Sequence, residues 1–247
     1  MVNDFAREVR ERIESNATDE RLKERAWGFL LPSIPARYSY NFSWLGRPII
    51  QYPQDIVAMQ EIIWSVQPDL IVETGIAHGG SLIFSASMLE LNAACGGPAD
   101  AQVLGVDIDI RRHNRDAIER HPMFKRITMI EGSSVAADVI AQVADRAAAR
   151  QRVLVCLDSN HTHDHVLAEL EAYAPLTSVG SYCVVYDTLI EEMPADMFPD
   201  RSWGPGNSPK SALDEYLRIH PEFVNDDLVD AKLLISAARG GYLRRIR

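Results

Sequence analysis

Two carboxylates and a histidine lie where apolar runs end, in a spacing that suits metal-assisted chemistry. Asp158 ends the run at residues 153–158, and Asp187 ends the run at residues 182–187. Carboxylate oxygens are hard ligands, and Mg²⁺ in proteins usually takes one or two of them and keeps several waters. His161 follows Asp158 closely enough to act as a general base on a hydroxyl held by that metal. These residues predict a metal-dependent active site.

A glycine-rich turn, ETGIAHGGS, occupies residues 73–81 directly after another apolar run. Glycines at such a point let the backbone approach a ligand closely, and the helix that follows offers free N–H groups. The turn lacks the G-x-G-x-x-G spacing of a dinucleotide site and the Gly-Lys-Ser/Thr of a phosphate loop. It therefore predicts a ligand site without naming the ligand.

Asp107 and a pair of serines extend this site toward a nucleoside. Asp107 ends the apolar run at residues 103–107, where an acid can accept hydrogen bonds from two ribose hydroxyls. Asp109, two residues further on, is more typical of a solvated loop. Ser133 and Ser134 follow the run at residues 127–130 and are small enough to lie along an adenine ring.

Strands alternating with helices must position these residues. Apolar, strand-like runs occur at residues 70–73, 103–107, 127–130, 153–158 and 182–187, separated by helical stretches at 81–92, 115–120, 136–149 and 165–174. This alternation predicts βαβ units in a mostly parallel sheet covered by helices on both faces. A helix at 211–220 and two late strands, at 231–236 and 242–245, would complete the sheet, with an antiparallel hairpin around residues 239–241. We predict a doubly wound α/β fold that binds its ligand at the carboxyl ends of the strands.

The first ~20 residues predict a charged helix outside the main core. Residues 31–52 are rich in proline and aromatic residues, which is typical of a packed cover or of a flap over a pocket. Pro53 then opens a helix that reaches Val66. We therefore divide the chain into an extension at 1–52, helical and aromatic, and a ligand-binding domain at 53–247. The extension also predicts a homo-oligomer, because helices outside a core often bury their apolar stripe against a neighbouring copy.

Composition restricts the partners. The chain has 247 residues, and its formal charge of −10 disfavours a nucleic-acid substrate. The basic cluster at residues 239–247 is too short to reverse that field. Three cysteines lack paired spacing, and neither a signal peptide nor a membrane-spanning run of ~18 apolar residues is apparent. These features predict a cytoplasmic protein whose partner is a small molecule.

Seven sequence blocks, taken together, identify a family. They are ETGxxxGGS at 73–81, GVD at 105–107, EGSS at 131–134, LDSxHxxxHV at 157–166, VVYDT at 184–188, GPG at 204–206 and GGYL at 240–243. In this order they resemble the cephalosporin-hydroxylase-like family of class I methyltransferases. That family includes rhamnosyl O-methyltransferases and is related to macrolide sugar O-methyltransferases. The resemblance covers residues 44–245.

The resemblance implies a seven-stranded, Rossmann-like methyltransferase fold, S-adenosylmethionine as methyl donor, Mg²⁺, and a hydroxyl acceptor, preferably on a sugar of a natural product, glycolipid or polysaccharide. Matching positions imply these roles: Glu73, Gly75 and Ser81 at the methionine end of the donor, Asp107 at the ribose, Ser133 or Ser134 at the adenine, Asp158 as a donor-binding and catalytic residue, Asp158 and Asp187 at the metal, and His161 as the base. One position departs from the pattern. Relatives often carry an acidic pair after the fifth strand, whereas the first of the pair here is Tyr186, which predicts weaker metal binding.

Two other functions remain open at this stage. His161, His163 or His165 with Asp158 could form the two-histidine, one-carboxylate site of a non-haem iron hydroxylase. Such sites usually lie on a β-barrel, and this interpretation leaves the glycine-rich turn and Asp107 without a purpose. A binding or regulatory module that keeps the methyltransferase fold without catalysis is the second alternative, and Tyr186 favours it slightly.

Overall fold

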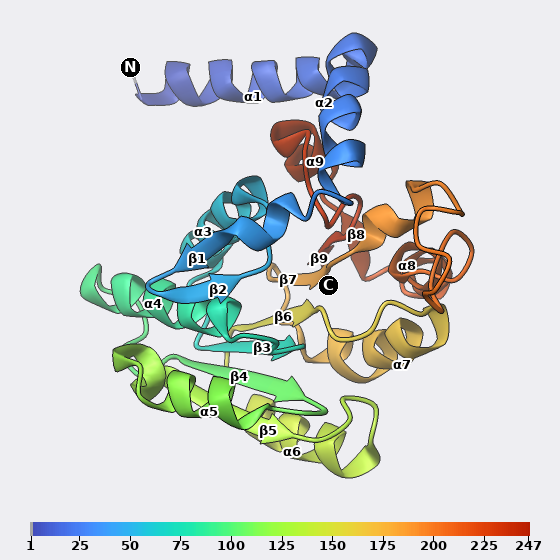
Figure 1. Ribbon diagram of the computed structural model, residues 1–247. Coiled ribbons are helices and arrows are strands. Elements are labelled where there is room, and N and C mark those ends of the chain that lie inside the picture. Colours follow the sequence, from blue (N-terminus) through green and yellow to red (C-terminus); the bar gives the residue numbers. More distant parts are fainter. Residues whose placement is uncertain (1) are drawn as a thin grey trace.

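The computed structural model describes residues 2–247, and its centre is a seven-stranded sheet with the strand order β5-β4-β3-β6-β7-β9-β8 (Figure 1). β9 pairs antiparallel with β7 and with β8, and the remaining neighbours pair parallel. The prediction of a doubly wound, mostly parallel seven-stranded α/β fold is confirmed. The strands are β3 (Leu70–Thr74), β4 (Gln102–Asp107), β5 (Ile127–Glu131), β6 (Val153–Leu157), β7 (Tyr182–Val185), β8 (Phe223–Asn225) and β9 (Tyr242–Arg245).

Helices cover both faces of the sheet (Figure 1). One face packs against α3 (Pro53–Val66), α4 (Gly80–Ala94) and α5 (Arg112–Glu119), and the other against α6 (Ala137–Ala148), α7 (His163–Tyr173) and α8 (Pro209–Ile219). β3 and β6 are buried along their whole length, as parallel strands between two helical layers must be. Each of these helices overlaps a predicted one, and the predicted limits of α3 are confirmed.

The N-terminal part of the chain contains α1 (Val2–Thr18), α2 (Glu20–Ser33) and a hairpin of β1 (Phe42–Trp44) and β2 (Arg47–Ile49). α1 lies apart from the sheet, where it meets α9 (Asp227–Leu233) and projects past the domain (Figure 1). The hairpin packs on α4: the Trp44 indole N–H donates to Ser87 Oγ at 2.9 Å. A Cβ on Gly80 would lie 2.1 Å from the Pro48 carbonyl oxygen, so glycine permits this close contact.

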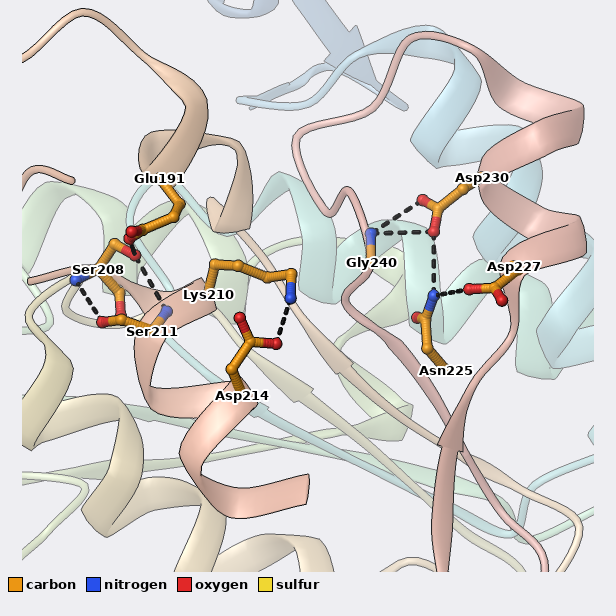
Figure 2. Close-up of polar contacts among 9 residues, drawn as sticks. All are labelled: Glu191, Ser208, Lys210, Ser211, Asp214, Asn225, Asp227, Asp230 and Gly240. Carbon is orange, nitrogen blue, oxygen red and sulfur yellow. Dashed lines mark hydrogen bonds and ion pairs between the residues drawn. The ribbon is translucent and has the colours of Figure 1, made fainter. Parts of the chain in front are cut away.

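The late part of the sheet corrects one prediction. Residues 231–236 are not a strand, because Ala231 and Leu233 end α9 instead, and the sixth strand is β8. No hairpin forms around residues 239–241. Asp230 on α9 accepts the Gly240 N–H at 3.0 and 2.9 Å, which fixes the helix beside the turn into β9 (Figure 2).

Within residues 2–247, no helix is both long enough and apolar enough to span a membrane.

Candidate active site

The loops that follow β3 and β6 cross at Gly75. Gly75 has a φ of +89°, and a Cβ at this position would lie 2.0 Å from the Asp158 carbonyl oxygen. Its N–H donates to the Val106 carbonyl at 2.8 Å, which ties the turn to β4 as well. Only glycine allows both the conformation and the contact. The predicted role of Gly75 at the methionine end is a proposal, but its place at the crossing brings Glu73, Asp107 and Asp158 to one edge of the sheet.

Glu73 and Ser81 meet at this edge. Glu73, the fourth residue of β3, is 4% exposed, and the Ser81 hydroxyl at the start of α4 donates a short hydrogen bond to its carboxylate. Burial raises the pKa of Glu73 to about 7, and the hydrogen bond from Ser81 opposes that shift. The two residues expected at the methionine end are therefore neighbours.

A small cavity of about 10 Å³ adjoins Glu73, enough for about one water molecule. Its polar lining consists of Gln51, Glu73, Ser81, Ser85, Asp158 and Tyr186. Gln51 and Ser85 were not predicted from the sequence. Neither lies in a recognisable motif, and Gln51 reaches the cavity only because the β1–β2 hairpin folds back on α4.

Asp107 holds the glycine-rich turn. Its Oδ2 atom accepts the N–H groups of Ile76 at 2.8 Å and Ala77 at 3.2 Å, and its Oδ1 atom accepts the N–H of Asp109 at 3.1 Å. The carboxylate is half-buried at the end of β4, whereas Asp109 is exposed. Asp107 thus fixes the turn at the position where a ribose contact was predicted.

The two serines after β5 differ in their surroundings. Ser134 is 4% exposed, and its Oγ lies 3.1 Å from Nε2 of His165. The same nitrogen lies 3.1 Å from the hydroxyl of Ser159, which donates to the buried Glu169. Ser134 therefore belongs to a polar cluster behind the loop, while Ser133 is half-buried.

Asp158, His161 and Asp187 form one cluster, in which a ligand atom from each lies within 4.8 Å of the others. The His161 Nε2 atom lies 3.2 Å from Oδ2 of Asp187. Burial, followed by the negative charge of Asp187, raises the pKa of Asp158 well above its usual range. Two carboxylates and one imidazole fit a divalent cation, whose charge would offset the repulsion between the carboxylates.

Asp187 adopts a left-handed backbone conformation, with a φ of +55°, between β7 and the 3₁₀ helix Thr188–Glu192. Such strain is often found at functional positions. Tyr186, beside it, is 4% exposed and lines the Glu73 cavity. The residue that replaces the expected acid therefore faces the same buried space as Asp158.

The other two histidines of this stretch lie away from the cluster. His163 Nδ1 is 2.9 Å from the Ser211 hydroxyl, its Nε2 is 3.5 Å from the Glu215 carboxylate, and His165 belongs to the polar cluster around Ser134. Among the described residues, the candidate metal cluster contains a single histidine. This geometry does not assemble the two-histidine, one-carboxylate site of an iron hydroxylase.

A loop between the 3₁₀ helix and α8 lies beside His161. The Trp203 and His161 rings form a T-shaped pair with their centroids 6.0 Å apart, and the Trp203 and Phe198 ring centroids are 5.6 Å apart. The far end of this loop is held at Glu191, whose carboxylate accepts the Gly206 N–H at 3.0 Å. The same carboxylate accepts the Ser208 hydroxyl at 2.5 Å (Figure 2). The loop is thus fastened beside the cluster.

Comparisons with known proteins agree with this geometry. Residues 36–246 match a family model described as Rhamnosyl O-methyltransferase/CmcI. Rhamnosyl O-methyltransferase of Mycobacterium leprae (strain TN) is 30% identical over 205 residues, which cover 82% of each chain. The protein of the same name from Mycobacterium bovis (strain BCG / Pasteur 1173P2) is 32% identical over 197 residues, covering 77% of this chain and 73% of that protein. A solved structure described as "CmcI-N160 apo-structure" has the same fold, with a TM-score of 0.58 at 19% identity, covering 84% of this chain and 77% of that chain.

Proposed function

The chain belongs to the rhamnosyl O-methyltransferase/CmcI family of S-adenosylmethionine-dependent O-methyltransferases, and we propose that it methylates a hydroxyl group of a sugar, with Mg²⁺ at Asp158 and Asp187 and with His161 as the base. The observation that carries this proposal is the Gly75 crossing. It brings the glycine-rich turn directly beside the Asp158, His161 and Asp187 cluster, so a donor bound at this turn would meet the acceptor at one edge of the sheet.

The residues present fit the donor. Glycine at position 75 lets the turn pack directly against the Asp158 backbone, and Asp107, which holds the turn through the Ile76 N–H, is our candidate for the ribose contact. The buried acceptors around Glu73 suit the polar methionine end. Ser133 would lie along the adenine, with Ser134 supporting the loop from behind through His165.

The residues also fit a hard divalent cation, because the cluster offers two carboxylates. Besides burial, the negative charge of Asp187 helps to raise the pKa of Asp158, and a bound cation would offset that repulsion. Bound there, Mg²⁺ would supply a positive charge that lowers the pKa of the acceptor hydroxyl. Tyr186 removes one expected carboxylate, and His161 lies close enough to replace it as a ligand. We keep His161 as the base because its ring pairs with Asp187, as a general base pairs with an orienting carboxylate.

The proton transfer follows from that pair. If the His161 Nε2–H donates to Asp187, the lone pair of Nδ1 is free to accept the proton of the acceptor hydroxyl. The Asp187 carboxylate then stabilises the charged imidazolium. Holding the acceptor oxygen in line with the donor methyl supplies much of the rate gain, as effective molarities of about 10⁵ M or more show for well-oriented reactants.

A sugar acceptor is supported by the names of the mycobacterial relatives and by the aromatic surface of Trp203 and Phe198 beside His161. The extension at 1–52 would complete and cover the site through its aromatic part at residues 31–52, whose Gln51 lines the cavity, whereas α1 lies apart from it (Figure 1). The exposed α1 supports a homo-oligomer, and three free cysteines support a cytoplasmic protein.

The test is methyl transfer from labelled S-adenosylmethionine to rhamnosides, other glycosides and catechol, with and without Mg²⁺. Methylation of a glycoside that requires Mg²⁺ supports the full proposal. Donor binding without transfer to any acceptor would favour the binding module, and transfer to catechol alone would contradict the sugar acceptor.

A further inference from the structure

Gln51 carries a buried oxygen atom that has no hydrogen-bond partner among residues 2–247. Gln51 lies between β2 and α3 and is 7% exposed, and its Oε1 atom accepts no hydrogen bond. An unsatisfied buried acceptor destabilises a folded protein, because the atom has lost its hydrogen bond to water without gaining another. Such an atom in a native structure calls for a ligand or a water as its missing partner.

The surroundings of Gln51 indicate the charge of that partner. The cavity that Gln51 lines also contains the carboxylates of Glu73 and Asp158 and the hydroxyl groups of Ser81 and Ser85. Carboxylates accept hydrogen bonds, hydroxyl groups accept as well as donate, and no lysine, arginine or histidine lines the cavity. A ligand that fits this lining is a small cation with several N–H donors.

The donor of the proposed reaction contains such a group. We propose that Gln51 Oε1 accepts a hydrogen bond from the α-ammonium group of the methionine moiety of S-adenosylmethionine. This inference rests on the proposed function, and it adds a donor-binding residue from the segment that precedes the main domain. The ammonium would lie beside Glu73 at the base of the glycine-rich turn, while the carboxylate group of the donor would face away from this acidic lining.

The chain holds Gln51 firmly enough for this role. Ile49, two residues before Gln51, and Tyr52, directly after it, are 1% and 3% exposed, and the Tyr52 hydroxyl lies 2.7 Å from the Ser33 hydroxyl. The backbone at Pro48 is packed against Gly80. A binding residue on a segment with so little freedom loses little entropy when the ligand binds.

A matched pair of variants tests the inference. Gln51→Met keeps the length of the side chain and removes its oxygen. Gln54→Met is the control, because Gln54 also has a buried Oε1 without a partner but does not line the cavity. Since each change removes an unsatisfied acceptor, both empty variants should melt at or above the wild-type temperature. Gln51→Asn, which withdraws the oxygen by one methylene, serves as a second variant.

Binding is measured by calorimetry with three ligands: S-adenosylhomocysteine, its 5′-aminopropylthio analogue, which lacks the carboxylate, and its 5′-carboxypropylthio analogue, which lacks the amine. Gln51→Met and Gln51→Asn should weaken binding of the two amine-containing ligands by about tenfold or more, because the lost hydrogen bond is to a charged group. Binding of the carboxypropylthio analogue should not change, and Gln54→Met should bind all three like the wild type.

The outcomes separate this inference from the function on which it rests. Equal weakening for all three ligands, or no weakening for any, overturns the role of Gln51 and leaves the donor intact. A wild-type protein that binds none of the three ligands overturns the methyltransferase proposal together with this inference.

Discussion

The Nε2 atom of His161 lies 3.2 Å from Oδ2 of Asp187, across the gap between the loops that follow β6 and β7. Asp187 therefore has two roles in the proposed site, as a metal ligand and as the group that orients the imidazole. The two roles do not conflict, because a carboxylate has two oxygen atoms. Because of this pairing, the orientation of the His161 ring depends on Asp187. Substitution of either residue therefore measures its contribution.

His161→Ala should reduce turnover by about 10² to 10⁴, the usual contribution of a general base, and leave the affinity for S-adenosylhomocysteine unchanged. Single-turnover methylation and calorimetry measure the two effects. His113→Ala, at an exposed position of α5, is the matched control and should behave as the wild type. Full turnover by His161→Ala would remove His161 from the role of base.

Asp158→Asn should abolish binding of Mg²⁺ without destabilising the empty protein. Burial and the charge of Asp187 already disfavour the ionised form of Asp158, so a neutral amide of similar shape relieves repulsion. Thermal melts in EDTA should show an unchanged or higher melting temperature. The increase in melting temperature that Mg²⁺ causes in the wild type should disappear. An increase that persists in Asp158→Asn would contradict the assignment of this residue as a ligand.

Glu73 should make the stability of the empty protein depend on pH. Burial raises its pKa from 4.5 to about 7, so the folded protein binds more protons than the unfolded chain between these values. The free energy of unfolding should therefore fall as the pH rises through this window, by no more than about 3 kcal/mol from Glu73.

Urea unfolding at pH 5 and pH 7 measures this effect, and Glu73→Gln should reduce the difference while keeping an acceptor for Ser81. Asp55, whose pKa burial raises to about 6, contributes in the same direction and should leave a residual slope. Identical slopes for the wild type and Glu73→Gln would show that Glu73 is ionised across the window.

The strand ends could be predicted from sequence because each parallel strand is a buried apolar run that stops at a polar residue. That pattern located Glu73, Asp107, Asp158 and Asp187 at the edge where the structure brings them together. It did not locate Gln51, because no periodicity connects a residue before α3 with the end of β3. Gln51 and Glu73 line the same cavity because the β1–β2 hairpin packs against α4.

The end of the sheet was mispredicted for a related reason. β8 contains three residues, too few for a clear pattern, and its neighbour Pro221 argues against a strand. The run at residues 231–236 is apolar enough for a strand, but α9 is fixed by contacts distant in sequence, including Asn16 with the Ala231 carbonyl at 3.4 Å. Tertiary contacts of this kind override local preference.

Asp107→Asn should weaken binding of S-adenosylhomocysteine by at least about tenfold, because the amide would direct N–H donors at the turn or at the ribose. Asp109→Asn, exposed and two residues away, is the control. An analogue without the 2′-hydroxyl distinguishes a ribose contact from support of the turn. If Asp107 contacts the ribose, the wild type should prefer the hydroxylated ligand and the variant should not. An equal preference in both proteins would leave Asp107 only its contacts with Ile76 and Ala77.

Glu191→Gln should raise the KM for the acceptor and leave donor binding unchanged. The Glu191 carboxylate accepts hydrogen bonds from the Gly206 N–H and from the Ser208 hydroxyl (Figure 2). A glutamine amide has only one acceptor oxygen, so it cannot replace both oxygens of the carboxylate. The loop that carries Trp203 would then move more freely beside His161, so an acceptor that stacks on this aromatic surface would bind more weakly. We expect an increase in KM of about tenfold, the loss of one charge-assisted hydrogen bond.

Asp214→Asn provides the control, since Asp214 pairs with Lys210 on the exposed side of α8 near the same segment (Figure 2). Steady-state kinetics with a varied glycoside and saturating donor measure KM and kcat separately. A loss in kcat with unchanged KM would mean that the loop positions His161 for proton transfer, because the Trp203 ring packs against the imidazole. An unchanged KM and kcat would mean that the acceptor does not use this loop.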